Sequence, residues 1–127
     1  MASTIKITAG NVEATAELND SQTAGAIRDA LPITARASTW GDEIYFAIPV
    51  HLDEESAQAT VARGDLGYWP PGSALCIFFG PTPASRTPGE IRPASPVNVF
   101  GQVQGDATRF KQVRSGESVI IERADGT

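Results

Sequence analysis

His51 is the single histidine of the chain, and it precedes three consecutive acids, Asp53, Glu54 and Glu55. If this segment were extended, His51 and Asp53 would lie on one face, because side chains two residues apart on a strand point the same way. A histidine oriented by a carboxylate is the arrangement of a general base. No activated nucleophile can be identified to complete such a site, so we favour a solvated loop histidine among acids.

The same acids do not predict a metal site. They lack the spacing of an EF-hand loop and would need further oxygen ligands from elsewhere in the chain. The single cysteine, Cys76, and the single histidine are too few for a zinc site of the usual ligand count. Glycine-rich phosphate loops are also missing, since neither a Walker string nor G-x-G-x-x-G occurs. We expect no metal and no cofactor.

Residues 64–86, GDLGYWPPGSALCIFFGPTPASR, form the segment richest in aromatic residues and prolines. In its strand-like centre, Leu75, Ile77 and Phe79 alternate with Cys76 and Phe78. A strand that is apolar on both sides is either buried on both faces or uses one face to line a pocket or a partner surface. We interpret Cys76 as a small hydrophobic residue, since a reactive thiol needs an electropositive, partly exposed setting.

Aromatic and polar residues in and around this segment could bind a ligand. Tyr68 and Trp69 stand at a strand end, where they could stack on a bound molecule, and Thr82 offers a hydroxyl on a proline-stiffened loop. A small barrel also needs aromatic bulk in its core, and this core interpretation competes with the ligand site. The ligand-binding candidates are Glu43, Tyr45, Tyr68, Trp69, Phe79, Thr82 and Asn98. No catalytic residue is assigned.

Short strands must position these residues. The segment Gly10-Asn11 is a tight hairpin turn between the first two strands. Apolar residues that recur at every second position predict strands at 5–8, 12–18, 33–39, 43–48, 73–79, 96–106 and 117–123. With the strand before residue 70, the count is about eight, and short strands with glycine and proline turns favour a barrel or a sandwich.

Two helical segments are expected beside the strands. Residues 19–21 can cap a helix in which Ala24, Ile27 and Leu31 recur at helical spacing and which Pro32 ends. This helix is short and should cover the end or side of the sheet. Asp106 can cap one or two further helical turns.

Size and charge limit the classes of partner. The 127 residues predict one domain, 1–127, and a net charge of −5 with no basic stripe argues against nucleic acid. The longest apolar run, ALCIFF, is far shorter than the roughly 20 residues that cross a bilayer, so no membrane is expected. The first ten residues lack the pattern of a signal peptide, and we expect a cytoplasmic protein.

Several strings, taken in order, resemble the cyclophilin fold, a closed eight-stranded barrel capped by helices. SQTAGAIRDAL (21–31) looks like the first cyclophilin helix, and VFGQV (99–103) is similar to its Val-Phe-Gly-Lys-Val strand. STWGDEIYF, GDLGYWPPG, FFGPTP and PVNVFG resemble more closely a family of small bacterial and archaeal cyclophilin-like proteins of unknown function. The resemblance implies a mainly β, closed cyclophilin-like barrel of about eight strands with one or two short capping helices.

Cyclophilins isomerise X–Pro bonds with an arginine in a Phe-His-Arg string on the strand after the first helix. The corresponding strand here, EIYFAI, has neither the histidine nor the arginine, and it carries Glu43 and Tyr45. An arginine beside the prolyl nitrogen favours the deconjugated state and so lowers a rotational barrier of roughly 18–20 kcal/mol. Arg63, Arg86 or Arg92 could reach the same space from loops, so a divergent prolyl isomerase stays an alternative.

We expect a cyclophilin-like protein that binds a small molecule or an extended peptide in a groove on the side of the barrel. Catalysis is not predicted, and an enzyme of this kind would be isomerase-like. A third hypothesis is a structural or regulatory subunit that presents Tyr68 and Trp69 to a protein partner, or forms a homodimer.

Overall fold

A computed structural model describes residues 3–124 of the chain. Its strands are β1 (Ser3–Ala9), β2 (Val12–Leu18), β3 (Ile33–Arg36), β4 (Ser38–Thr39), β5 (Glu43–Ala47), β6 (Asp65–Trp69), β7 (Ala74–Phe78), β8 (Asn98–Val103) and β9 (Ser118–Arg123). One α-helix, α1 (Gln22–Asp29), and two 3-10 helices, η1 (Pro70–Gly72) and η2 (Ala107–Gln112), accompany them. None of the helices in this described range is long and apolar enough to span a membrane.

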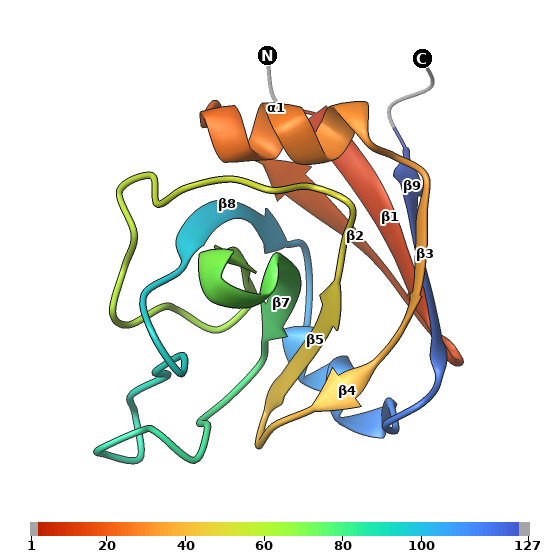
Figure 1. The fold of residues 1–127 in the computed structure, drawn as a ribbon. Coiled ribbons are helices and arrows are strands. Elements are labelled where there is room, and N and C mark those ends of the chain that lie inside the picture. The colour runs from red at the N-terminus through yellow and green to blue at the C-terminus, as the bar shows by residue number, and fades with distance from the viewer. Residues whose placement is uncertain (1–2, 125–127) are drawn as a thin grey trace.

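The strands form one sheet that curls into a nearly closed barrel (Figure 1). Their order is β3-β9-β1-β2-β8-β6-β7-β5-β4, and each neighbouring pair is antiparallel. The two end strands of this order, β3 and β4, are consecutive in the chain, with only Ala37 between them. The predicted mainly β barrel is confirmed, with nine strands in place of about eight.

The additional strand arises because the predicted strand 33–39 is interrupted at Ala37. This residue is buried, its N–H donates to the carbonyl of Glu117 at 2.8 Å, and its carbonyl accepts from the N–H of Gly116 at 2.7 Å. Its backbone is thus bonded to the turn before β9. On one side of it β3 pairs with β9, and on the other side β4 pairs with β5.

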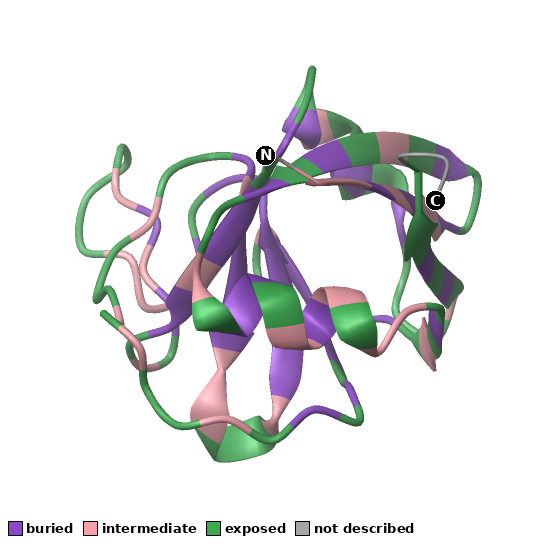
Figure 2. Cartoon of the chain, turned by 90° about the horizontal axis from the view of Figure 1, so that it is seen from above, coloured by how far each residue is buried: buried purple, intermediate pink, exposed green. Residues whose placement is uncertain are grey.

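Alternating apolar residues fill the inside of the barrel. Ile5 and Ile7 of β1 are fully buried, and the buried residues in Figure 2 concentrate on the strands while exposed residues lie mainly on the loops. The helix α1 lies across one end, where Ile27 is fully buried (Figure 1). At the other end η2 contributes the fully buried Phe110, whose ring centre lies 6.3 Å from that of Phe79.

Two sets of hydrogen bonds start α1. The Ser21 hydroxyl accepts the N–H of Ala24 at 3.1 Å, as the predicted N-cap requires. The Glu55 carboxylate accepts the N–H groups of Gln22 and Thr23 at 2.9 and 2.8 Å and the Thr23 hydroxyl at 2.7 Å. The Thr23 hydroxyl and the two N–H groups lower the pKa of Glu55. One member of the predicted acidic cluster therefore anchors the helix.

The long connection between β5 and β6 is tied to the barrel by buried polar side chains. The Tyr68 hydroxyl donates to the carbonyl of Val50 at 2.6 Å and accepts the N–H of Leu52 at 3.1 Å. The Asn98 amide accepts the N–H of Glu55 at 2.8 Å and donates to the carbonyl of Asp53 at 3.0 Å. Both residues satisfy backbone groups that the connection would otherwise leave unpaired.

Tyr68→Phe should lower the free energy of unfolding by about 1–3 kcal/mol, because it leaves the Val50 carbonyl and the Leu52 N–H without their partner. Urea unfolding measures this loss. Tyr45→Phe is the matched control, since the half-buried Tyr45 makes no hydroxyl hydrogen bond with the described residues. Equal losses in the two variants would show that the Tyr68 hydroxyl does not hold the connection.

Candidate functional site

A cavity of about 260 Å³ lies on the outer face of the barrel, over β5, β7 and β6. Glu43 and Tyr45 face it from β5, and Cys76 faces it from β7, where it pairs with Tyr45. These residues point outward because their neighbours in sequence, such as Ile44 and Ile77, are buried in the barrel core. The eight lining residues are Trp40, Glu43, Tyr45, Trp69, Cys76, Pro93, Ala94 and Val97.

The loop 79–97 forms the outer wall of this cavity. The Trp69 indole N–H donates to the Ser95 hydroxyl at 2.6 Å, and Val97 exchanges backbone hydrogen bonds of 2.8 and 3.1 Å with Gln58. Farther along the loop the Thr82 hydroxyl donates to the carbonyl of Arg92. The wall is therefore bonded both to β6 and to itself, which gives the cavity a defined shape.

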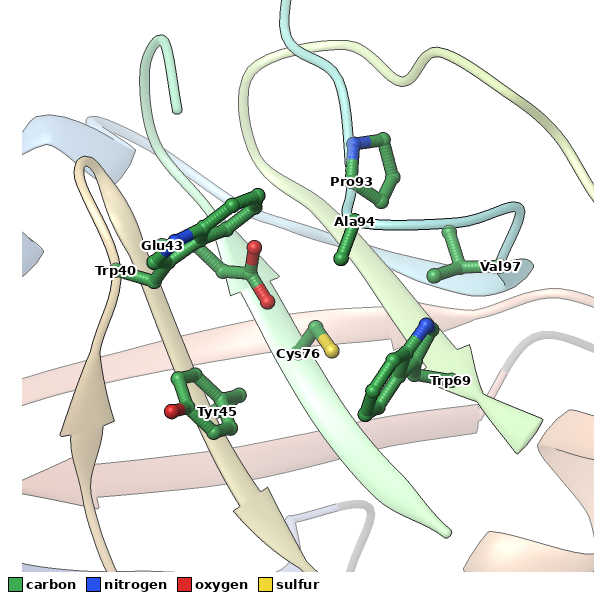
Figure 3. A pocket seen from close by; sticks show the side chains of 8 residues that line it. All are labelled: Trp40, Glu43, Tyr45, Trp69, Cys76, Pro93, Ala94 and Val97. Carbon is green, nitrogen blue, oxygen red and sulfur yellow. The ribbon is translucent and has the colours of Figure 1, made fainter. Parts of the chain in front are cut away.

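The turn before β5 brings Trp40 to the same space. The N–H of Trp40 donates to the carbonyl of Glu43 at 2.9 Å, and Gly41 adopts a positive φ of 60°. A side chain at Gly41 would also meet Pro83 at 2.7 Å. In Figure 3, Trp40 lies beside the Glu43 carboxyl group, and Tyr45 and Trp69 lie on either side of Cys76.

The Glu43 carboxyl group is the most unusual polar group of the cavity. The side chain is buried, with only 5% of its surface exposed, and its Oε1 atom has no hydrogen-bond partner within residues 3–124. Burial raises the pKa of Glu43 from 4.5 to about 7, although a hydrogen bond with the Cys76 thiol acts in the opposite direction. Near neutral pH this carboxyl group can therefore either donate or accept a proton.

Cys76 differs from a reactive thiol. Burial raises its pKa well above 9.0, and the neighbouring Glu43 adds to this effect. The thiol consequently stays protonated and serves as a hydrogen-bond partner for the carboxyl group. The interpretation of Cys76 as a small buried residue agrees with its 2% exposure, but its position beside Glu43 was not predicted.

Three of the predicted ligand-binding residues meet at this cavity. Glu43, Tyr45 and Trp69 all line it, although they come from two different strands. The predicted division of β7 is also confirmed, because Leu75 and Ile77 belong to the barrel core whereas Cys76 belongs to a separate cluster on the outer face. One face of this strand therefore does line a pocket.

The other four candidates lie elsewhere. Tyr68 is fully buried inside the barrel, and Phe79 packs in the core against Phe110. Asn98 holds the β5–β6 connection, and Thr82 holds the loop 79–97 together. None of these four is among the lining residues of the cavity, and a binding role for them stays a prediction.

The remaining chemical candidates are also outside the cavity. The Nδ1 atom of the exposed His51 lies 2.9 Å from the Ser73 hydroxyl. The Arg92 guanidinium is bound to both carboxylate oxygens of Glu90, at 2.9 and 3.1 Å, while Arg63 and Arg86 are exposed on loops. Within residues 3–124 no group of three or more histidine, cysteine or acidic side chains is arranged to hold a metal ion.

Five lining residues were not predicted as ligand-binding residues: Trp40, Cys76, Pro93, Ala94 and Val97. For two of them the sequence contained a pattern from which a place at the cavity could have been predicted. Cys76 shares a strand face with Phe78, and Trp40 stands in a turn next to the strand that carries Glu43. Pro93 and Ala94 depend on the path of a loop for which the sequence has no periodic pattern, and Val97 lay in the predicted strand 96–106 without any sign that it faces a cavity.

The raised pKa of Glu43 predicts a pH-dependent stability. Between pH 4.5 and about 7 the folded protein keeps a proton that the unfolded chain has released, so folding is favoured at the lower pH. Raising the pH through this window should lower the free energy of unfolding by about 3 kcal/mol relative to Glu43→Gln, which carries no titrating group there. Urea unfolding of both proteins across this range measures the difference. Parallel pH profiles would show that Glu43 titrates normally.

Comparisons with known proteins agree with this architecture. The sequence matches the family described as Cyclophilin-like over residues 3–122. It is similar to the solution structure of the hypothetical protein AF2241 from Archaeoglobus fulgidus, with 43% identity and a TM-score of 0.82 over 97% of this chain and 95% of that one. No curated protein matches the chain. With this match over almost its whole length, the chain belongs to the cyclophilin-like family.

Proposed function

We propose that this protein binds a small molecule in the cavity over β5, β7 and β6, with Glu43 as its polar anchor. The observation that carries the proposal is the unpartnered Oε1 atom of this buried side chain, which faces an aromatic cavity (Figure 3). Buried polar atoms nearly always have a hydrogen-bond partner, and a missing partner costs about 1–3 kcal/mol. A ligand that hydrogen-bonds Glu43 would supply the missing partner.

A small molecule fits the site better than an extended peptide does. The strands beneath the cavity, β5, β7 and β6, are each paired on both sides, so a peptide cannot add to them as a further strand. The cavity volume of about 260 Å³ is close to the lower end of the range, about 300–1,000 Å³, typical of small-ligand pockets. Its walls are mainly apolar and aromatic with a few polar groups, Glu43 among them, which is the usual composition of such pockets.

The cavity is also preformed. Hydrogen bonds from Trp69 to Ser95, from Thr82 to Arg92 and between Val97 and Gln58 hold its wall in place. A site whose walls are already ordered loses less conformational entropy when a ligand binds. This favours measurable affinity even for a compound of one ring.

Blocking the cavity should abolish binding of single-ring fragments. We expect a fragment set of cationic, neutral and anionic compounds to yield at least one that shifts the backbone amide NMR signals of Glu43, Tyr45 and Cys76 in a saturable way. Ala94→Phe, which adds a ring at a lining position, should weaken that compound at least about tenfold, or about 1.4 kcal/mol.

Thr87→Phe is the matched control, because Thr87 is exposed on the same loop but does not line the cavity. It should leave the affinity unchanged. Binding that survives Ala94→Phe, or signal shifts confined to other parts of the barrel, would contradict the proposed function. A peptide that shifts the same signals more strongly than every fragment would show that the ligand is an extended peptide and not a small molecule.

A further inference from the structure

The charges around the cavity restrict the ligands that it can take. Glu43 is the one lining residue of the eight with a side chain that ionises near neutral pH. No lysine, arginine or histidine stands among them. The nearby Arg92 is paired with Glu90, and Lys111 lies 3.9 Å from Asp42. An anionic ligand would therefore meet a carboxyl group with no lining cation to offset it.

The aromatic residues favour a ligand of the opposite charge. Trp40, Tyr45 and Trp69 approach the cavity from three different segments, with the Glu43 carboxyl group among them (Figure 3). The electron-rich faces of tryptophan and tyrosine attract organic cations, most strongly where water is excluded. The Ser95 hydrogen bond holds the Trp69 ring in place, so this surface is preorganised.

We propose that the cavity binds a small organic cation, an ammonium group on a short apolar body. Its charge pairs with the Glu43 carboxylate, and its apolar part lies against Trp40, Tyr45 and Trp69. This inference rests on the proposed function, since it assigns the chemical class of ligand to the same cavity. A neutral ligand could accept a hydrogen bond from the protonated Glu43 carboxyl group or donate one to the ionised carboxylate. In neither case would the ligand form an ion pair with the negative charge of Glu43.

The two ionisation states of Glu43 separate a cation from a neutral acceptor. The other titratable groups that line the cavity are the Cys76 thiol on β7 and the Tyr45 phenol on β5. On the adjoining segments, Asp42 of the β4–β5 turn faces Lys111, and Arg92 of the loop 79–97 is held by Glu90. A cation binds the ionised acid, so its affinity rises with pH, whereas an acceptor binds the protonated acid and loses affinity.

The test uses the full chain and three single-ring probes: benzyltrimethylammonium, benzyl alcohol and phenylacetate. Benzyltrimethylammonium keeps its charge at every pH, so any pH dependence of its binding belongs to the protein. We expect its affinity, measured by tryptophan fluorescence and amide NMR shifts, to rise about tenfold between about pH 6 and about pH 8. Phenylacetate should bind more weakly than benzyl alcohol throughout.

Glu43→Gln keeps the size and hydrogen-bonding ability of the side chain but removes its charge. At about pH 8 it should weaken benzyltrimethylammonium at least about tenfold, weaken benzyl alcohol much less, and abolish the pH dependence of benzyltrimethylammonium binding. Thermal unfolding and the dispersion of the NMR signals check that the variant is folded. The pH profile of the unaltered protein tests the same inference without any substitution.

The outcomes separate this inference from the proposed function. If benzyl alcohol binds in the cavity but benzyltrimethylammonium does not bind more tightly at higher pH, the proposal of a cationic ligand is wrong and the proposal of a small-molecule site is retained. If neither probe shifts the signals of Glu43, Tyr45 and Cys76, both are overturned for single-ring ligands. Equal weakening of both probes by Glu43→Gln would show a loss of cavity shape and would also overturn the charge pairing.

Discussion

Every residue of β7 is buried, because the barrel core covers one face and the loop 79–97 covers the other. The second cover keeps the outer-face side chains of Cys76 and Phe78 out of water, where exposed apolar surface costs about 25 cal/mol per Å². Two of the contacts between this loop and the barrel lie near its two ends. The N–H of Asp42 donates to the carbonyl of Pro81 at 2.9 Å. The Val97 side chain packs against Gly67 so closely that a Cβ atom at Gly67 would lie only 2.8 Å from it. The cavity lies between this loop and the outer face of β5, β7 and β6.

The buried polar groups of this molecule differ in one respect. The side chains of Tyr68, Asn98 and Thr82 all hydrogen-bond backbone groups of the chain. Tyr68 and Asn98 hold the β5–β6 connection to the barrel, and Thr82 holds the loop 79–97 together. Glu43 has only the Cys76 thiol as a partner, and one of its oxygens faces the cavity unpaired. Natural proteins break the rule of satisfied buried groups mainly where function requires it. Among the buried polar residues within 3–124, Glu43 is therefore the one that keeps an unpaired oxygen at the cavity.

Period-two alternation predicted the two faces of the strands, because it reflects burial directly. It left a barrel and a sandwich open, and the resemblance to cyclophilins favoured the barrel. The same rule separates Tyr68 from Trp69: adjacent strand residues point to opposite faces, so only one of them could reach an outer cavity. Thr82 and Asn98 show the limit of this reasoning. A polar residue that binds backbone and one that binds a ligand look alike in a sequence. The lining residues of the loop 79–97 depend on contacts with distant segments such as Gln58, which no local pattern encodes.

The charge on β5 differs from that of the corresponding cyclophilin strand, and this difference bears on function more than the shared fold does. By resemblance, cyclophilins that rotate prolyl bonds carry an arginine on this strand, and that positive charge acts on the amide nitrogen. Here the strand carries an acid, and the lining residues supply no positive charge in its place. A carboxyl group cannot replace an arginine as a hydrogen-bond donor once it is ionised, and it repels the electron-rich groups that an arginine attracts. The strand that carries an arginine in cyclophilins carries an acid in this chain, which agrees with the rule that a fold positions a site without deciding its chemistry.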